Sequence, residues 1–523
     1  MIAAVFQSLR RRLWTPAVLA PLALALIGAL GLIFRLSDLA ARDLWTDEAW
    51  VALAALKASP GAALAAGQST PPFYLLTVWA AVKIWGGQEW VLRSLSFAFG
   101  VGTLVVIWRL ARALTSRSVS IVALAVVACS PIMVYYSKEL KQYSGDAFFA
   151  VMVFYLAERL RASDGRRGWT ALALTGLIGL GFSHTLVFCL PAAGLILWLS
   201  LPAARARLTL LGGLWVLTFS AYYFLFFRHA LDSELVAYWG QDYPDFSGLG
   251  PFFIWLGGAL YRYFWYFLGE WGPIWGPPFL LLGTYALWRR AQARALVYWG
   301  FPILLAFGAA ALHRYPFMAH YGGNRLMLFS APMFYLMVAA GACLVFSWLW
   351  QRRYRWVAAV LAGALLISLN PLALPGENLR SIMNREEISP LITRLEQELQ
   401  PRDWVYVYYF AQWPFEYYYR GPLERLCVGK SCVETGLQPN AAGAAPERVW
   451  LIASHIPPLE DMREFAAKLL GPEWRETACY QGEGAVLFCF QGSEALENAN
   501  RRERLPRPPG SAAAALPGER ACR

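Results

Sequence analysis

Two adjacent carboxylates, Asp47 and Glu48, lie between two tryptophans in the segment RDLWTDEAW, just after the first long apolar run. An aspartate at the edge of a cavity can act as a general base and take a proton from an incoming hydroxyl. Adjacent residues of a loop or strand point in different directions, so we expect one carboxylate to face a cavity and the other to hold the loop or a cation. The alternative is a short helix, with Thr46 as its N-cap and both acids favoured in its first turn by the helix dipole.

The rest of the chain has the composition of a membrane protein. Of its 523 residues, 58% are hydrophobic and only 15% are charged, an apolar share above that of a soluble domain. Runs of about 20 apolar residues, each long enough to cross a bilayer, recur between Thr15 and Pro375. We therefore predict a membrane domain at residues 1–375, a globular domain at residues 376–492 and a disordered tail at residues 493–523.

Basic clusters between the apolar runs mark the cytoplasmic side by the positive-inside rule. They are Arg10–Arg12, Arg109/Arg112/Arg117, Arg159/Arg161/Arg166/Arg167, Arg205/Arg207, Arg289/Arg290/Arg294 and Arg352/Arg353/Arg355. Consecutive clusters must be joined by an even number of crossings. Because three apolar runs separate the first two clusters, we interpret the short run Pro71–Gly86, which contains Lys83, as a helix lying in the outer leaflet. This gives about 11 crossings, with the N-terminus cytoplasmic and the C-terminal domain outside.

Three further features complete the predicted topology. The first apolar run extends to Ile33 without a small-residue cleavage site, so we expect a retained helix rather than a signal peptide. His184–Thr185 is expected to be a break between two helices, and Phe252–Leu268 an interfacial aromatic helix.

The distribution of acids indicates a functional outer side. Of the 14 Asp and Glu residues before Pro375, all but Glu158 and Asp164 fall on that side, as do all five histidines. Positive-inside selection alone is one explanation. The other is a site, because ionisable groups at helix mouths are costly to keep.

The cysteines suggest an oxidising compartment. Cys427 and Cys432 are close in the sequence, as are Cys479 and Cys489, so we expect two local disulfides. A metal site is disfavoured because no Cys-x-x-Cys pair occurs.

Three stretches resemble the GT-C glycosyltransferases that use polyprenyl-phosphate sugars: LWTDEAW, STPPFYLLTVWAAVKIWGGQEWVLRSLSFAFG and YYSKELKQYSGDAFFAV. The relatives include protein O-mannosyltransferases, lipid A aminoarabinose transferases and bacterial galacturonosyl transferases. The family pattern is an acidic pair in the first outer loop, a Pro-Pro-led juxtamembrane helix and a span opened by an arginine, here Arg93. The resemblance covers roughly residues 30–340 and is strong for the first 160. Many relatives carry His or Lys where this chain has Thr70, so any contact made from that position must come from elsewhere.

A second acidic cluster lies in SKELKQYSGD. Glu139 and Asp146 are seven residues apart, which on a continuous helix would place them on one face. The functional interpretation puts both acids in the cavity of Asp47, with Lys138 and Lys141 near a phosphate. The alternative is a solvated loop whose ion pairs contribute little.

A departing polyprenyl phosphate needs a cation, because a fixed guanidinium stabilises the developing charge more in the transition state than before it. Arg325, which follows YGGN at the mouth of a span, is the first candidate. Arg93 and Arg262 are second choices, and each is equally explained as an interfacial arginine that reaches lipid headgroups.

Three residues are further expected to line the substrate cavity: His184, His320 and Tyr143. Histidines in such positions are more often structural than catalytic. No cofactor is specified, although the acids and histidines on the outer side permit a divalent metal.

From Glu377 onward the pattern predicts a small periplasmic α/β domain. ISPLITRLEQELQ and LEDMREFAAKLL read as helices, DWVYVYYF and RVWLIASH as strands, WPFEYYYR as a helix start, and ETACYQGEGAVLFCF as a hairpin. The domain contains no Gly-rich phosphate loop and no Ser-His-Asp arrangement.

The sequence thus predicts a polytopic α-helical membrane protein of GT-C fold with a C-terminal α/β domain, in a bacterial inner membrane. The expected activity is inverting transfer of a sugar from a polyprenyl-phosphate carrier to an acceptor hydroxyl of a glycan, lipid or protein, with no nucleic-acid partner. Two alternatives stand beside it. One is a lipid-linked glycan transporter or flippase, disfavoured because the acids lie away from the midplane. The other is an oligosaccharyltransferase with a diphosphate-linked donor.

Overall fold

The protein was analysed as a computed structural model, which describes residues 16–67, 69–228, 237–320, 323–369, 386–421, 426–428, 446–455, 458–492 and 520–521. The chain divides into two compact units. The helical unit comprises Met1–Leu39 and Ala58–Ile382, and the sheet unit comprises Ala40–Lys57 and Met383–Arg523. The segment with the acidic pair therefore groups with the C-terminal domain, whereas the predicted boundaries place it with residues 1–375.

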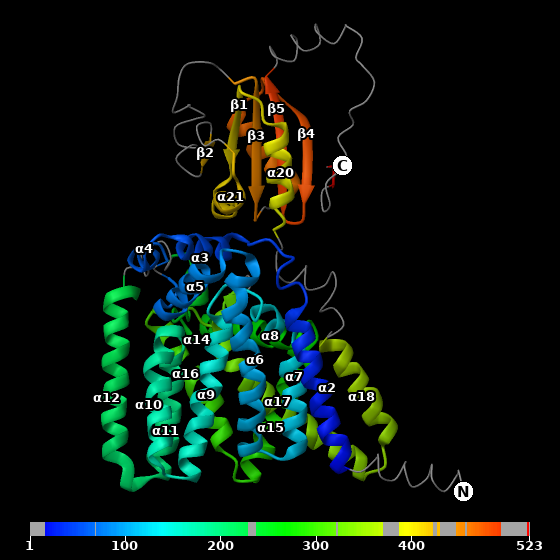
Figure 1. Cartoon of the computed structure of the whole chain (residues 1–523). Coiled ribbons are helices and arrows are strands. Elements are labelled where there is room, and N and C mark those ends of the chain that lie inside the picture. The colour runs from blue at the N-terminus through cyan, green and yellow to red at the C-terminus, as the bar shows by residue number, and fades with distance from the viewer. Residues whose placement is uncertain are drawn as a thin grey trace, which may run out of the picture. The chain divides into compact units, whose positions relative to one another are not determined.

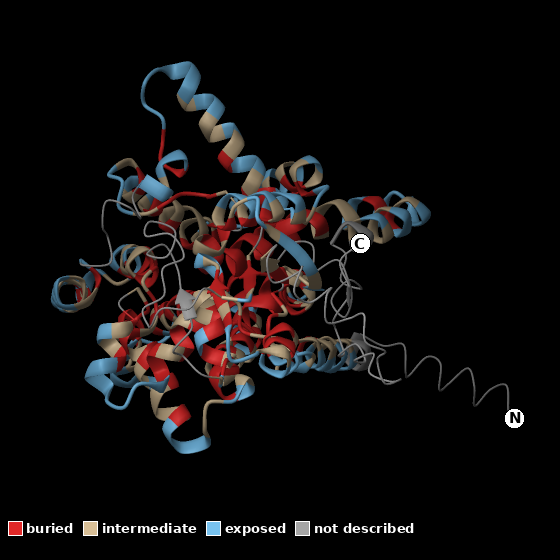
Figure 2. Ribbon diagram, turned by 90° about the horizontal axis from the view of Figure 1, so that it is seen from above, coloured by how far each residue is buried: buried red, intermediate tan, exposed pale blue. Residues whose placement is uncertain are grey.

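The helical unit is a bundle of long, mostly antiparallel helices with buried residues gathered at its centre (Figures 1 and 2). Its α-helices are α2 (Pro16–Leu36), α4 (Pro60–Ala66), α5 (Pro72–Trp85), α6 (Glu89–Leu114), α7 (Arg117–Cys129), α8 (Pro131–Tyr136), α9 (Tyr143–Ala162), α10 (Arg166–Phe182), α11 (Leu186–Ser200), α12 (Arg205–Tyr222), α14 (Leu249–Leu268), α15 (Gly272–Arg289), α16 (Arg294–Ala311), α17 (Ala331–Gln351) and α18 (Arg355–Leu369). The 3-10 helix η4 (Gly323–Ser330) leads into α17. The predicted break at His184–Thr185 is confirmed between α10 and α11.

Several helices are suited to a bilayer. Within the described residues, four helical stretches are long and apolar enough to cross a membrane: Glu89–Leu114, Pro202–Phe227, Arg294–Ala311 and Gly323–Gln351. Large apolar side chains such as Leu210 and Leu217 of α12 are 76% and 67% exposed. Such a surface is unfavourable in water and favourable against lipid. The count of about 11 crossings stays a prediction.

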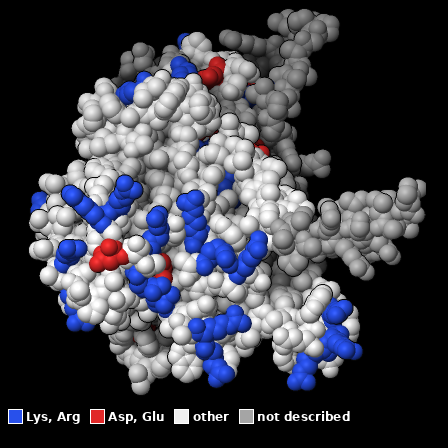
Figure 3. Space-filling view, turned by 60° about the horizontal axis from the view of Figure 1, so that its bottom comes forward, with Lys and Arg blue, Asp and Glu red and all other residues white. Residues whose placement is uncertain are grey.

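Basic side chains gather at one end of the helical unit (Figure 3). They lie in the last turns of α6, α9 and α15, and α7, α10, α12, α16 and α18 each begin at an arginine. This arrangement is what the predicted single cytoplasmic face requires. The cluster Arg10–Arg12 lies outside the described residues.

Glu158 is a buried acid at this basic end. Its side chain is 1% exposed and binds Arg161 of its own helix α9. It also accepts hydrogen bonds of 3.0 Å from Arg294 and from the hydroxyl of Tyr298, both on α16. Charge-assisted bonds of this kind are stronger than neutral ones, so Glu158 joins α9 to α16.

We expect Glu158→Ala to destabilise the protein by about 1–3 kcal/mol, because its partners lose their charged acceptor. Thermal unfolding of the purified protein measures this as a lower apparent Tm. Asp164→Ala is the matched control, since Asp164 bonds only the exposed Trp169 indole among the hydrogen bonds described. Equal Tm values for the two variants would contradict the role of Glu158.

The sheet unit contains a six-stranded mixed sheet of order β2-β1-β3-β5-β4-β6. The strands are β1 (Asp403–Val407), β2 (Leu426–Val428), β3 (Arg448–Ser454), β4 (Trp474–Gly482), β5 (Ala485–Gly492) and β6 (Arg520–Ala521). β1, β2 and β3 are parallel, and the β4–β5 hairpin is the predicted one. β6 belongs to the tail predicted to be disordered; the rest of residues 493–523 lies outside the described residues.

Helices cover both faces of this sheet. One face packs against α20 (Ser389–Glu398) and α21 (Gln412–Tyr418), through residues such as Leu391 and Phe415. The other packs against α23 (Leu459–Leu470), through Met462 and Ala466. A further helix of the unit, α3 (Thr46–Leu56), contacts α21. The predicted helices and strands of the C-terminal α/β domain are confirmed.

The predicted disulfide between Cys479 and Cys489 is wrong. Cys489 is a free, buried thiol, whereas Cys479 is disulfide-bonded. In the β4–β5 register Cys489 lies opposite Ala478. Because side chains alternate along a strand, Cys489 faces the α20 side and Cys479 the α23 side. Cys432 and the side chain of Cys427 lie outside the described residues.

Burial raises the pKa of the Cys489 thiol to about 11. We therefore expect Cys489 to resist a maleimide in the folded protein and to react after denaturation without reductant. Peptide mass mapping checks both states. Failure to label after denaturation would indicate a disulfide at Cys489 and contradict the free thiol.

Candidate functional site

The acidic pair lies in the first turn of α3, as predicted. Asp47 is partly exposed and Glu48 is fully buried. Thr46 is not the N-cap: the capping position belongs to Trp45, which makes no side-chain cap bond. The Thr46 hydroxyl instead donates a 2.6 Å bond to the carbonyl of Phe410, so it is occupied by the C-terminal domain.

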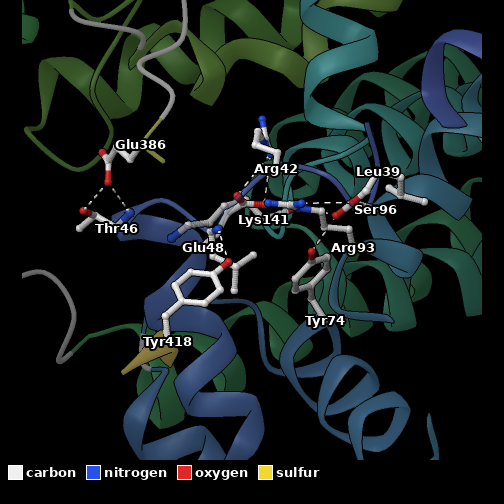
Figure 4. Close-up of polar contacts among 11 residues, drawn as sticks. Leu39, Arg42, Thr46, Glu48, Tyr74, Arg93, Ser96, Lys141, Glu386 and Tyr418 are labelled. Carbon is white, nitrogen blue, oxygen red and sulfur yellow. Dashed lines mark hydrogen bonds and ion pairs between the residues drawn. The ribbon is translucent and has the colours of Figure 1, made fainter. Parts of the chain in front are cut away.

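Glu48 holds the loop. Both of its carboxylate oxygens lie 3.3 Å from the Nη2 atom of Arg42, which is itself buried (Figure 4). The pair joins residues six positions apart, one before α3 and one in its first turn. Glu48 thus fits the expectation that one of the two carboxylates holds the loop, and Asp47 is the more exposed of the two.

The start of α3 is bonded to the start of α20. The Oε2 atom of Glu386 lies 3.3 Å from both the backbone nitrogen and the hydroxyl of Thr46 (Figure 4). In return, Asp43 accepts 2.8 Å bonds from the backbone nitrogen and the hydroxyl of Ser389. Each helix N-terminus therefore meets a carboxylate from the segment that precedes the other helix.

Three further contacts hold the same segment. The backbone nitrogen of Leu44 donates to the hydroxyl of Tyr418 at 2.8 Å. His455 places Nδ1 2.8 Å from Oε1 of Glu386, and its ring stacks on Trp45 with a centroid distance of 6.2 Å. A carboxylate only accepts, so Nδ1 is the donor. The acidic segment is thus held by side chains from α21, from the end of β3 and from the segment before α20.

In the helical unit, three predicted site residues come together around a tyrosine pair. The guanidinium of Arg325, on η4, lies 5.6 Å from the ring centre of Tyr143 at the start of α9. Tyr143 packs edge-on against Tyr136, whose hydroxyl lies 2.6 Å from that of Tyr266. The charges of Arg325 and Glu139 both act on these two hydroxyls. This arrangement suits an anion, because the guanidinium and the one tyrosine hydroxyl that does not donate to the other can both donate to it.

Glu139 and Asp146 do not lie on one continuous helix, which was the condition for placing them on one face. α8 ends at Tyr136 and α9 begins at Tyr143, so Glu139 lies in the turn between them. The backbone nitrogen of Lys138 bonds the carbonyl of Tyr135, three residues earlier, and does not continue a four-residue ladder. The two acids consequently have different surroundings.

Asp146 lies at the start of α9 and accepts hydrogen bonds from Ser183 and Thr185. Both donors belong to the break between α10 and α11. His184 of the same break places Nε2 3.2 Å from the carbonyl of Ser69 and contacts the ring of Phe227. Asp146 therefore fixes the break, and His184 joins it to the segment before α5.

The other predicted cations are bonded to or through the backbone. Arg93 is fully buried and donates to the carbonyl of Leu39 at 3.2 Å, and Lys138 donates to the carbonyl of Ser37 at 2.9 Å. Both carbonyls follow α2. Lys141 is buried, and its carbonyl accepts a 3.0 Å bond from Ser96. These contacts make Arg93 and Lys138 anchors of the chain leaving α2.

His320 pairs with an aspartate that the sequence analysis did not single out. Its Nδ1 and backbone nitrogen both contact Oδ1 of Asp242, which is 1% exposed. Asp242 also acts electrostatically on Arg262, which bonds the carbonyl of Met318. Throughout the described ranges, no three His, Cys, Asp or Glu residues are grouped in a way that would hold a metal ion.

Sequence reasoning also missed Asp43, Glu386 and His455. The first two had a weak local signal: each is a carboxylate three residues before a Thr or Ser that begins a helix. No local sequence pattern connects Glu386 with Thr46 or Asp43 with Ser389, because these bonded residues are 340 and 346 positions apart.

Comparison with known proteins bears on the fold and the family. Residues 69–228 match the family model described as dolichyl-phosphate-mannose-protein mannosyltransferase. The structure of ArnT from Cupriavidus metallidurans in the apo state aligns over 90% of this chain and 98% of that one, with a TM-score of 0.50 and 15% identity. The chain therefore has a GT-C-like fold. The apo oligosaccharyltransferase of Archaeoglobus fulgidus also aligns with it, over 91% of this chain and 75% of that one, with a TM-score of 0.50 and 11% identity.

The chain has no match among curated protein sequences. Its family match supports a membrane-embedded enzyme of the glycosyltransferase type, acting in lipid-linked sugar transfer. At identities of 11% and 15% the structural likenesses establish the fold alone. The expected GT-C resemblance is therefore confirmed, and the roles of individual residues are not tested by it.

Proposed function

We propose that the protein is an inverting glycosyltransferase that moves one sugar from a polyprenyl-phosphate carrier to an acceptor hydroxyl on the periplasmic side of a bacterial inner membrane. The match of residues 69–228 to the mannosyltransferase model carries this proposal, because dolichyl phosphate, named in its description, is a polyprenyl phosphate. The domains proposed for it are residues 1–375 for catalysis and residues 376–492 for the periplasmic domain.

Asp47 is the proposed general base. As the acceptor oxygen bonds to the anomeric carbon, its proton passes to the Asp47 carboxylate. The bond from the anomeric carbon to the phosphate oxygen breaks on the opposite face, and its electron pair leaves with the polyprenyl phosphate. Asp47 suits this role because it is partly exposed, while Glu48 is fixed in an ion pair with Arg42. General-base assistance of this kind contributes about 100- to 10,000-fold to rate.

Arg325 is the proposed partner of the leaving phosphate. The hydroxyls of Tyr136 and Tyr266 lie in the field of the same guanidinium, and Tyr143 packs under it. A guanidinium held in this way needs little reorganisation as charge develops on the departing oxygen. Glu139, Asp146, His184 and His320 are assigned to the surrounding cavity, with Lys138, Lys141 and Arg93 as supporting cations.

We expect Asp47→Asn to insert and fold normally but to lower kcat about 100- to 10,000-fold, because an amide does not take the proton. Glu270→Gln is the matched control, an exposed acid outside the site. Release of radiolabelled sugar from a defined polyprenyl-phosphate donor measures the rate.

The same assay separates the alternatives. A wild-type protein that moves the intact lipid-linked glycan across a vesicle membrane without releasing sugar would be a flippase. Turnover only with a diphosphate-linked oligosaccharide would indicate an oligosaccharyltransferase. Full turnover by Asp47→Asn would reject this residue as the base.

Arg325→Ala should lower kcat about 100- to 1,000-fold, as loss of one charge-stabilising donor does in other enzymes. Arg325→Lys should recover part of the rate, because it restores the charge without the planar fork. Arg314→Ala, which removes an exposed arginine in the connection between α16 and α17, is the control. Equal rates for Arg325→Ala and Arg314→Ala would contradict the assignment.

A further inference from the structure

The helices α3 and α20 exchange their caps. A helix N-terminus leaves backbone N–H groups without partners, and a side-chain oxygen of the preceding residue usually satisfies one of them. Here the N-cap residues are Trp45 and Ile388, and neither makes a side-chain cap bond. The carboxylate before α20, from Glu386, serves Thr46, and the carboxylate before α3, from Asp43, serves Ser389.

The geometry of the exchange is reciprocal. Glu386 is three residues before Ser389, and Asp43 is three residues before Thr46. Each carboxylate reaches both the backbone nitrogen and the hydroxyl of its target residue. Neither helix start can shift without stretching bonds at the other, because the two caps share the same pair of chain segments.

The Glu386 carboxylate has a second hydrogen-bonding residue besides Thr46. Its side chain is fully buried, and its other oxygen accepts from Nδ1 of His455 at 2.8 Å. A buried carboxylate is costly unless it is well bonded. The backbone nitrogen of Thr46 and Nδ1 of His455 donate to it, and the Thr46 hydroxyl, whose closer acceptor is the Phe410 carbonyl, lies 3.3 Å away. Asp47 directly follows Thr46. The bonds between Thr46 and Glu386 therefore also restrain the first turn of α3, where Asp47 lies.

We propose that the C-terminal domain is a positioning element for sugar transfer, in which Glu386, supported by His455 and matched by Asp43, fixes the carboxylate of Asp47. This inference rests on the proposed role of Asp47 as the base. It gives the domain a role in the rate of the chemical step rather than in donor affinity. A misplacement of about 1 Å at a reacting group can lower a rate about 100-fold.

The test uses the full-length protein with Glu386→Ala, Asp43→Ala, and the pair Thr46→Val and Thr46→Ser. Thr46→Val removes the hydroxyl that bonds Glu386 and Phe410, and Thr46→Ser keeps it. The matched control is Arg463→Ala, which breaks an exposed ion pair with Glu476 in the same domain. The readouts are kcat and KM for the polyprenyl-phosphate donor, and amide hydrogen exchange over residues 46–50.

We expect Glu386→Ala and Asp43→Ala to lower kcat about 10- to 100-fold, with KM changed less than about threefold. Exchange at the start of α3 should become faster in both variants. Thr46→Val should lie between them and wild type, and Thr46→Ser and Arg463→Ala should remain near wild type. In Asp43→Ala/Glu386→Ala, the loss of rate should be smaller than the product of the single losses, because one geometry is disrupted twice.

Wild-type kcat and exchange in Glu386→Ala and Thr46→Val would overturn the proposal. If Glu386→Ala does not fold, the Thr46→Val and Thr46→Ser pair decides. Parallel measurement of Asp47→Asn separates this inference from the proposed function. Loss of rate in Glu386→Ala with full turnover in Asp47→Asn would remove Asp47 as the base, and the domain would then affect the rate through a group other than Asp47. The reverse result would retain the base and remove the positioning role.

Discussion

The constraint on which the site depends is the bonding of a short acidic segment to a domain that follows it by more than 300 residues in the sequence. The bonds between Thr46 and Glu386 and between Asp43 and Ser389 span 340 and 346 positions. One cap contributes about 0.5–2 kcal/mol to a helix. Two such contacts, with the ion pair of Glu48 and Arg42, select one arrangement for a segment that would otherwise be a flexible loop. Asp47, in the first turn of the same helix, is partly exposed.

The helical unit meets the cost of buried charge in a similar way, by giving several of its buried charged side chains hydrogen-bond partners. Glu158 joins α9 and α16 through two arginines and a tyrosine, at the end where basic residues gather (Figure 3). Away from that end, Arg93 and Lys138 bind carbonyls that follow α2. Arg325 contacts the ring of Tyr143, and its charge acts on the hydroxyls of Tyr136 and Tyr266. We assign the phosphate to Arg325 first because these hydroxyls lie in the field of its guanidinium.

Local patterns in the sequence predicted the elements well. Apolar periodicity and glycine turns gave the helices and strands of the C-terminal domain, and the polar interruption at His184 gave the break between α10 and α11. The same reasoning failed where a residue far away in the sequence determines which bonds a side chain makes. Thr46 is an ordinary N-cap residue by type, yet Phe410 and Glu386 occupy its hydroxyl.

The other errors have the same origin. Seven-residue spacing put Glu139 and Asp146 on one helix, but turn bonds around Lys138 end α8 before the first of them. Closeness in sequence suggested a bond between Cys479 and Cys489, but strand register places them on opposite faces of the sheet. Asp242 is the partner of His320, and no sequence spacing connects the two.

The most direct test of the account is a structure of the protein with an acceptor and a non-transferable phosphonate analogue of a polyprenyl-phosphate sugar. The account predicts the Asp47 carboxylate at about 3 Å from the acceptor hydroxyl, with the Arg325 guanidinium on the phosphonate. A complex in which another carboxylate, such as Glu139 or Asp146, contacts that hydroxyl while Asp47 lies beyond its reach would contradict it.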